Sequence, residues 1–280
     1  MDVLIVEAEK KMNTELILGS GASACKDSSG LLAVCRSAML NGIRRFDTAP
    51  SYRTEETLSL AVSTCASELK IGREEYFIQT KIDPIQMYNG NIEEYFESKL
   101  RGMRLDYVDS LLIHWPVRDY LVQTWESMHR IKERGLAKKT GICNLRVRHL
   151  EELLALGIEP EIVQIERHPL NTFSEEVRFC HEHDVELQDY SPLCKMHPVL
   201  RDNEKIAAIA ALHGRSIGQV ILRWHFDTGA SAVFTSTKPV RISEYAQIKD
   251  FSLSEEEINV ISSLNCNHKL YLESLICPGF

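Results

Sequence analysis

The sequence lacks any apolar run that approaches the roughly 20 residues needed to cross a bilayer. Residues 1–11 carry acidic side chains within their only apolar stretch, which argues against a secretory signal peptide. Eight cysteines are present, but none of them forms a Cys-x-x-Cys pair, a usage typical of reduced thiols rather than of a disulfide framework. We therefore expect a cytoplasmic protein that has no membrane partner.

Basic residues are in deficit, because 32 lysines and arginines stand against 40 acidic residues and give a formal net charge of -8. Such a balance argues against a general affinity for nucleic acid or for anionic lipid surfaces. The segment Cys180–Asp184 gathers a cysteine, two histidines and two acids, but its spacing at a helix end does not collect ligands tetrahedrally. We expect no metal, and a small molecule as the partner of a monomer or weak dimer.

No linker, low-complexity segment or break in composition divides the 280 residues, so we expect one domain over residues 1–280. Short β-rich runs alternate with amphipathic helical stretches along the whole chain. The helical stretches include 30–41, 91–103, 120–134 and 202–213. The expected strands are Ile43–Asp47, Tyr76–Lys81, Val108–His114, Lys139–Cys143, Ile162–Glu166, Val185–Asp189, Ala230–Thr235 and, less clearly, Tyr245–Lys249.

Eight strands that each lead towards a helix predict a parallel sheet closed into a (β/α)₈ TIM barrel of the α/β class. Val3–Val6 and Glu15–Leu18 are expected to form an N-terminal β-hairpin that caps the bottom of this barrel. The rival architecture, an open doubly wound sheet, would need a glycine-rich phosphate turn after its first strand, and the chain has none there.

Polar side chains gather at the ends of the first three expected barrel strands, where a barrel carries its functional groups. They are Asp47, with Tyr52 shortly after it, then Lys81 and His114. A tyrosine with a reference pKa of about 10 needs a neighbouring cation to act as an acid at neutral pH. Lys81 can supply that cation, Asp47 can keep Lys81 charged, and His114 can orient a substrate oxygen.

Each of these four residues also has a structural interpretation when it is taken alone. A strand-end aspartate often caps the next turn or helix, a lysine is often solvated, a tyrosine can be an ordinary half-buried aromatic, and a histidine after a strand is more often hydrogen-bonded structure than catalyst. Their occurrence on three successive strands favours a joint catalytic role.

Three motifs that carry these residues resemble active-site signatures of the aldo-keto reductase superfamily. They are Phe-Asp-Thr-Ala-Pro-Ser-Tyr (46–52), Gln-Thr-Lys (79–81) and Leu-Leu-Ile-His-Trp-Pro (111–116), and the resemblance runs from about Ile17 to Leu264. It implies that the phenol of Tyr52 is the general acid, that Lys81 and Asp47 tune it, and that His114 positions the carbonyl.

The later strands are similar to the cofactor side of that family. The resemblance implies that Cys143, Asn144 and Gln164 hold the nicotinamide carboxamide, although Cys143 replaces the usual serine and is a weaker donor. The Tyr-Ser-Pro-Leu segment, with Tyr190, Ser191 and Leu193 as binding residues, implies a tyrosine ring that stacks on the nicotinamide face.

The adenosine end departs from the family pattern. Ser236 and Arg241 remain as candidate ligands of a 2′-phosphate, but Thr235 replaces the usual lysine and Tyr245 the usual asparagine. Losing one charge-assisted contact costs about 1.5–3 kcal/mol, and Lys238 is placed to compensate. We expect NADP(H) as the cofactor, with NAD(H) as the alternative.

The substrate side departs as well. Ser23 and Asp83 stand where the family often has aromatic walls, and Trp115 is the one large ring that the motifs bring beside the carbonyl. These changes predict a wider, more polar pocket and a polar or cationic substrate.

Three functions remain to be compared. The first is an NADP(H)-dependent oxidoreductase that reduces an aldehyde or ketone to an alcohol, or the reverse. The second is a nicotinamide-binding regulatory or redox-sensing protein with slow turnover. The third is a barrel lyase or aldolase that uses Lys81 as a Schiff-base nucleophile, a scheme that gives no use to Tyr190, Gln164 and Asn144.

Overall fold

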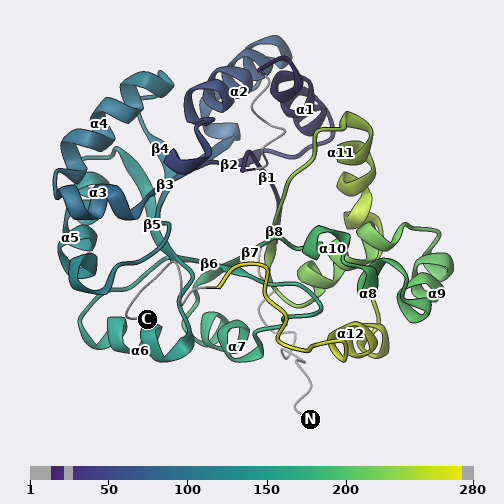
Figure 1. Cartoon of the computed structure of the whole chain (residues 1–280). Helices are drawn as coiled ribbons and strands as arrows, with labels where there is room; N and C mark the ends of the chain where they lie inside the picture. Colours follow the sequence, from purple (N-terminus) through teal and green to yellow (C-terminus); the bar gives the residue numbers. More distant parts are fainter. Residues whose placement is uncertain (1–13, 22–27, 273–280) are drawn as a thin grey trace.

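A computed structural model describes residues 14–21 and 28–272 of the chain. Eight parallel strands follow one another around a closed barrel, and the last pairs with the first (Figure 1). The strands are β1 (Leu16–Gly19), β2 (Arg45–Asp47), β3 (Phe77–Ile82), β4 (Val108–Ile113), β5 (Ala137–Cys143), β6 (Ile162–Glu166), β7 (Glu186–Tyr190) and β8 (Ser231–Phe234).

Helices surround this barrel (Figure 1). They are α1 (Ser28–Leu40), α2 (Glu55–Leu69), α3 (Pro84–Asn89), α4 (Ile92–Met103), α5 (Leu121–Glu133), α6 (Val147–Ala155), α7 (Ser174–Glu182), α8 (Pro198–Arg201), α9 (Glu204–His213), α10 (Ile217–Asp227), α11 (Pro239–Ala246) and α12 (Glu255–Ser262). Short 3₁₀ helices join them, namely η2 (Pro50–Tyr52), η3 (Arg73–Glu75), η4 (Arg118–Tyr120), η5 (Cys194–Met196) and η6 (Gln247–Asp250). Within the described ranges, no helix combines the length and the apolar character that a membrane crossing requires.

Local signals in the sequence fix where several helices begin and end. Ser254 accepts a hydrogen bond from the backbone N–H of Glu257 and so caps α12, as the sequence predicts. Asn203 caps α9 in the same way, and Gly214 ends that helix with a φ of 61° that glycine adopts without strain. The helices then bury their apolar faces in a large core around the barrel, while a second cluster forms where α8, α9, α10 and α12 pack together.

The prediction of an eight-stranded parallel barrel is confirmed, but two of its elements were wrong. Leu16–Gly19 is the first barrel strand, paired in parallel with β2 and β8, and it is not part of a capping hairpin. All four of its residues are buried, which suits a central strand. The other proposed hairpin strand, Val3–Val6, lies outside the described residues.

The segment Tyr245–Lys249, proposed as the eighth strand, is helical and spans the end of α11 and most of η6. Pro239 at the first turn of α11 favours a helix start, and Ile242 and Tyr245 are buried at a helical spacing of three residues. The number of strands is therefore as expected, while the set that closes the barrel begins one strand earlier in the chain.

Gly141, on β5, lies close to residues of the neighbouring strands β4 and β6. A Cβ atom at this position would lie 2.6 Å from Leu112 Cδ2 and 2.8 Å from Ile162 Cβ. Leu112 and Ile162 belong with Cys143 to a small buried cluster, so neither side chain has room to move. Glycine is needed here for close strand packing, not for an unusual backbone angle.

We predict that Gly141→Ala destabilises the fold by about 1–3 kcal/mol, because the added methyl overpacks a rigid part of the barrel. Gly102→Ala in α4 is the matched control, since its Cβ would meet only the flexible side chain of Glu56 and alanine favours a helix. Urea unfolding measures both. A Gly141→Ala protein as stable as Gly102→Ala would contradict this account of the packing.

Candidate active site

A cavity of about 710 Å³ opens among the loops that follow the strands. Its walls come from the carboxyl-terminal ends of strands around the barrel, the end at which barrels of this type carry their sites. The lining residues are Gly19, Gly21, Asp47, Ser51, Tyr52, His114, Trp115, Asn144, Gln164, Tyr190, Ser191, Pro192, Leu193, Lys195, Met196, Val233, Phe234, Thr235, Arg241, Tyr245 and Tyr271.

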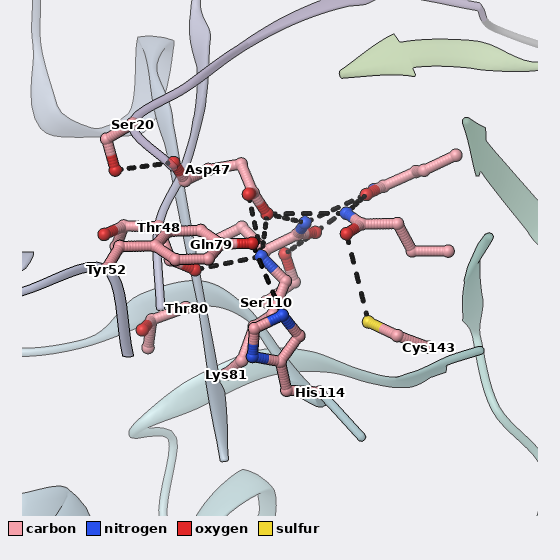
Figure 2. A network of polar contacts seen from close by, with 12 residues as sticks. Ser20, Asp47, Thr48, Tyr52, Gln79, Thr80, Lys81, Ser110, His114 and Cys143 are labelled. Atoms are coloured by element: carbon pink, nitrogen blue, oxygen red, sulfur yellow. Dashed lines mark hydrogen bonds and ion pairs between the residues drawn. The ribbon is translucent and has the colours of Figure 1, made fainter. Parts of the chain in front are cut away.

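A buried ion pair lies at the base of this cavity. Lys81 Nζ donates to both carboxylate oxygens of Asp47, each at 2.7 Å, and to the carbonyl oxygen of Thr48 at 3.0 Å (Figure 2). Lys81 is 1% exposed, and it is absent from the described residues that line the cavity. All three donors of its ammonium are thus engaged, so the interpretation of Lys81 as a Schiff-base nucleophile has no support from its surroundings.

Tyr52 and His114 meet directly above this pair. Tyr52, on η2, has its hydroxyl 3.3 Å from His114 Nε2, and the two rings are perpendicular with centroids 5.5 Å apart. Lys81 Nζ lies 5.1 Å from the centroid of the Tyr52 ring. The four residues proposed from the sequence as catalytic therefore come together from β2, η2, β3 and the end of β4 (Figure 2).

Burial and the neighbouring charges shift the pKa values of Tyr52 and Lys81. Burial raises the pKa of Tyr52 above its usual value, while Lys81 beside it lowers that pKa and Asp47 raises it. Burial lowers the pKa of Lys81, but Asp47, Tyr52 and Cys143 together outweigh burial and raise that pKa above its usual value. Lys81 is therefore a permanent cation, yet Asp47 compensates its charge, so the phenol of Tyr52 keeps its proton in the free protein.

Beneath the ion pair, a polar network that the sequence analysis missed runs through the barrel. Gln79 Nε2 donates to Asp47 Oδ1 at 2.6 Å and to Gln188 Oε1 at 2.9 Å. Gln164 Nε2 donates to the same Gln188 oxygen at 2.9 Å, and Ser110 Oγ donates to Gln79 Oε1 at 2.8 Å. The alternation of Gln79 with Lys81 along β3 was the available signal, because both side chains point to one face of a strand.

Most of the residues proposed for a nicotinamide line the cavity together. Asn144 accepts a hydrogen bond from the Tyr190 hydroxyl at 2.8 Å and donates to the carbonyl oxygen of His114 at 2.9 Å. Gln164 is beside them, and the following loop adds Ser191 and Leu193 to the wall.

Two further residues proposed for the cofactor, Cys143 and Ser236, are not among the described residues that line the cavity. Cys143 is fully buried, with its Sγ 3.9 Å from Gln164 Oε1. Ser236 Oγ accepts from the backbone N–H of Lys238 at 3.1 Å and so shapes the loop after β8. Arg241 lines the cavity in this region together with Thr235 and Tyr245, whose ring packs edge-on against Phe234.

On the substrate side, Trp115 lines the cavity as proposed and Ser23 falls outside the described residues. Asp83 needs correction. It is absent from the described cavity lining, its Oδ1 contacts His114 Nδ1, and its Oδ2 accepts from the backbone N–H of Ser51 at 2.7 Å. The carboxylate therefore supports the histidine from behind and is no wall of a polar pocket.

The sequence analysis also missed one side of the cavity. Lys195, Met196 and Tyr271 line it, and Lys195 Nζ lies 5.3 Å from the centroid of the Tyr271 ring. The backbone N–H of Tyr271 donates at 2.9 Å to Glu166, at the end of β6, so the barrel itself holds this late segment in place. Tyr271 reaches the cavity only through this long-range contact, so no local sequence pattern could have placed it there.

Comparison with known proteins finds chains similar to this one. The model of the aldo/keto reductase family matches residues 15–265. The chain is similar to the glyoxal reductase of Bacillus subtilis (strain 168), with 35% identity over 90% of each chain, and to the methylglyoxal reductase DkgA of Yersinia pestis, with 33% identity over 96% of this chain and 95% of the other.

A solved structure is similar over almost the whole barrel. It is the crystal structure of MGS-M4, an aldo-keto reductase enzyme from a Medee basin deep-sea metagenome library. The TM-score is 0.84 at 28% identity, and the match covers 94% of this chain and 97% of that one.

We predict that Lys81→Met destabilises the protein by about 3–5 kcal/mol, because it leaves the Asp47 carboxylate buried without a counter-ion. The double variant Lys81→Met/Asp47→Leu should recover most of that loss, since it removes both buried charges. Arg178→Ala, at an exposed ion pair on α7, is the control and should leave the unfolding midpoint unchanged. Urea unfolding measures all three variants. A double variant no more stable than Lys81→Met would show that the loss does not come from an unpaired Asp47 carboxylate.

Proposed function

The chain belongs to the aldo/keto reductase family, and we propose that it reduces small carbonyl compounds with NADP(H), using Tyr52 as the general acid. It is an aldo-keto reductase enzyme that interconverts a carbonyl and an alcohol, and its family uses a nicotinamide nucleotide. The observation that carries our proposal is the contact of the Tyr52 hydroxyl with His114 directly above the Lys81–Asp47 pair. The Tyr52–His114 contact, with Lys81 Nζ 5.1 Å from the centroid of the Tyr52 ring, favours turnover over the alternative of a slow redox sensor.

The donor set of the cavity fits a nicotinamide nucleotide. Asn144 and Gln164 present amide groups suited to the carboxamide, and Tyr190 offers a ring on which the nicotinamide can stack. At the other end, Arg241 offers a guanidinium for a phosphate, with Ser236 behind it in the same loop. When it is bound, the nicotinamide supplies the hydride that reaches the carbonyl carbon.

The chain's own residues handle the proton and the geometry. We infer that the Tyr52 hydroxyl gives its proton to the substrate oxygen as that oxygen gains negative charge. Lys81, held as a cation by Asp47, then stabilises the phenolate that remains. His114 orients the substrate oxygen, and Trp115 forms an apolar wall beside it.

For the substrate we propose a short aldehyde that carries a second oxygen next to the carbonyl. Support comes from the relatives named as glyoxal and methylglyoxal reductases. The charge beside the cavity also favours an oxygen-rich molecule, because Lys195 is a cation at its wall while Asp47 is already paired. With Asp83 behind His114, the expectation of a cationic substrate loses its support.

We predict that Tyr52→Phe lowers kcat for the reduction of methylglyoxal by about 10²–10⁴-fold, because it removes only the acidic hydroxyl. NADPH oxidation at about 340 nm reports turnover, and quenching of NADPH fluorescence reports nucleotide binding. Nucleotide affinity should stay within about twofold of the unmodified enzyme, as the lost hydroxyl contacts His114. Retained turnover would exclude Tyr52 as the acid.

We predict that Thr235→Lys strengthens NADPH binding by about 10–100-fold while NADH binding changes little, because the new ammonium can pair with the 2′-phosphate. Thr235 lines the cavity, whereas the exposed Thr237 is absent from the described lining. Thr237→Lys is therefore a control with the same added charge. Fluorescence titration measures both affinities, and equal gains in the two variants would mean a general charge effect.

A further inference from the structure

The two ring nitrogens of His114 have different partners. Nδ1 contacts the Oδ1 of Asp83, and Nε2 faces the Tyr52 hydroxyl at 3.3 Å. Asp83 follows β3 directly and is the N-cap of α3, so the backbone on both sides holds it in place. Its second oxygen accepts from the backbone N–H of Ser51 at 2.7 Å, and the residue is 6% exposed.

The charge of Asp83 follows from these contacts. Burial raises the pKa of the Asp83 carboxyl, but the hydrogen bond from His114, the charge that His114 carries when protonated and the hydrogen bonds from Ser51 together hold that pKa below its usual value. The carboxylate is therefore ionised near neutral pH and can only accept hydrogen bonds. The proton between the two residues must then be on His114 Nδ1.

His114 is neutral under the same conditions. Burial lowers the pKa of His114, and the cation of Lys81 acts in the same direction. The hydrogen bond and charge of Asp83 oppose this shift, as does the charge of Asp47, but the pKa remains below its ordinary value. A neutral imidazole has one N–H, so its Nε2 is a bare acceptor that receives the Tyr52 hydroxyl proton in a hydrogen bond.

We propose that Asp83 is a positioning residue that holds His114 as the Nδ1–H tautomer, so that neutral His114 presents an acceptor to the substrate. The consequence rests on the proposed function. A substrate carbonyl oxygen can only accept, so neutral His114 cannot donate to it, whereas an alcohol hydroxyl can donate to Nε2. Reduction is thus helped by protonated His114, and alcohol oxidation by the neutral form.

The tautomer itself can be measured without any turnover. In protein labelled with ¹⁵N-histidine, the two ring nitrogens of a neutral imidazole have different chemical shifts, and the loss of signals in His114→Gln assigns those of residue 114. We expect a protonated Nδ1 and a bare Nε2 at about pH 8. An Nε2–H tautomer in the unmodified protein would overturn the proposal, even if the enzyme reduces every carbonyl tested.

Asp83→Asn reverses the polarity of this contact. The backbone N–H of Ser51 needs an acceptor, so the new amide oxygen should pair with it and turn the amide NH₂ group towards His114 Nδ1. His114 should then become the Nε2–H tautomer in the ¹⁵N spectrum. Asp119→Asn, an exposed change on η4, is the matched control and should leave the spectrum unchanged. A retained Nδ1–H tautomer in Asp83→Asn would contradict the proposal.

The pH profile provides a second readout that a merely structural role would not change. In the unmodified enzyme, kcat/KM for reduction should fall above the pKa of His114 to a lower plateau, since only the protonated form donates to the carbonyl while Tyr52 remains the acid. In Asp83→Asn, the neutral form donates as well, so the profile should be flat between about pH 5 and 8. Identical profiles for the two proteins would overturn the proposed consequence for the substrate.

Discussion

The buried ion pair between Lys81 and Asp47 is the interaction on which the rest of the site depends. Both charges are removed from water, a cost that is offset only because each of the three N–H groups of the ammonium has an acceptor. The pair also joins β2 to β3 inside the barrel. It fixes a cation below Tyr52, so the fold and the chemistry rely on the same contact.

The network below this pair explains why so polar an interior is tolerated. Gln79 and Gln164 both donate to Asp47, and they also share the oxygen of Gln188. The side-chain amides hydrogen-bond to one another and to Asp47, so the charged pair is surrounded by oriented amide dipoles instead of apolar side chains. The same arrangement keeps the pKa of Tyr52 high, because Asp47 compensates the lysine and burial penalises the phenolate. Tyr52 therefore keeps its proton in the free protein.

Sequence patterns predicted the family and a group of polar residues that the fold brings together, but not every element of the barrel. The resemblance in motifs predicted a family that the comparisons confirm, and the four proposed catalytic residues lie together. The eighth strand and the hairpin were misplaced, because short apolar runs such as Leu16–Gly19 and Tyr245–Lys249 have no period that separates strand from helix. The single domain over residues 1–280 stays a prediction.

The sequence by itself determined the alternation of strands and helices, and it determined which polar residues end the strands, because both are written in local periodicity and residue type. Closure of the barrel decided the rest. It selected β1 as the neighbour of β8, turned Asp83 towards His114, and carried Tyr271 to the cavity from the far end of the chain. These outcomes depend on contacts between residues distant in sequence, and such contacts exist only once the chain is folded.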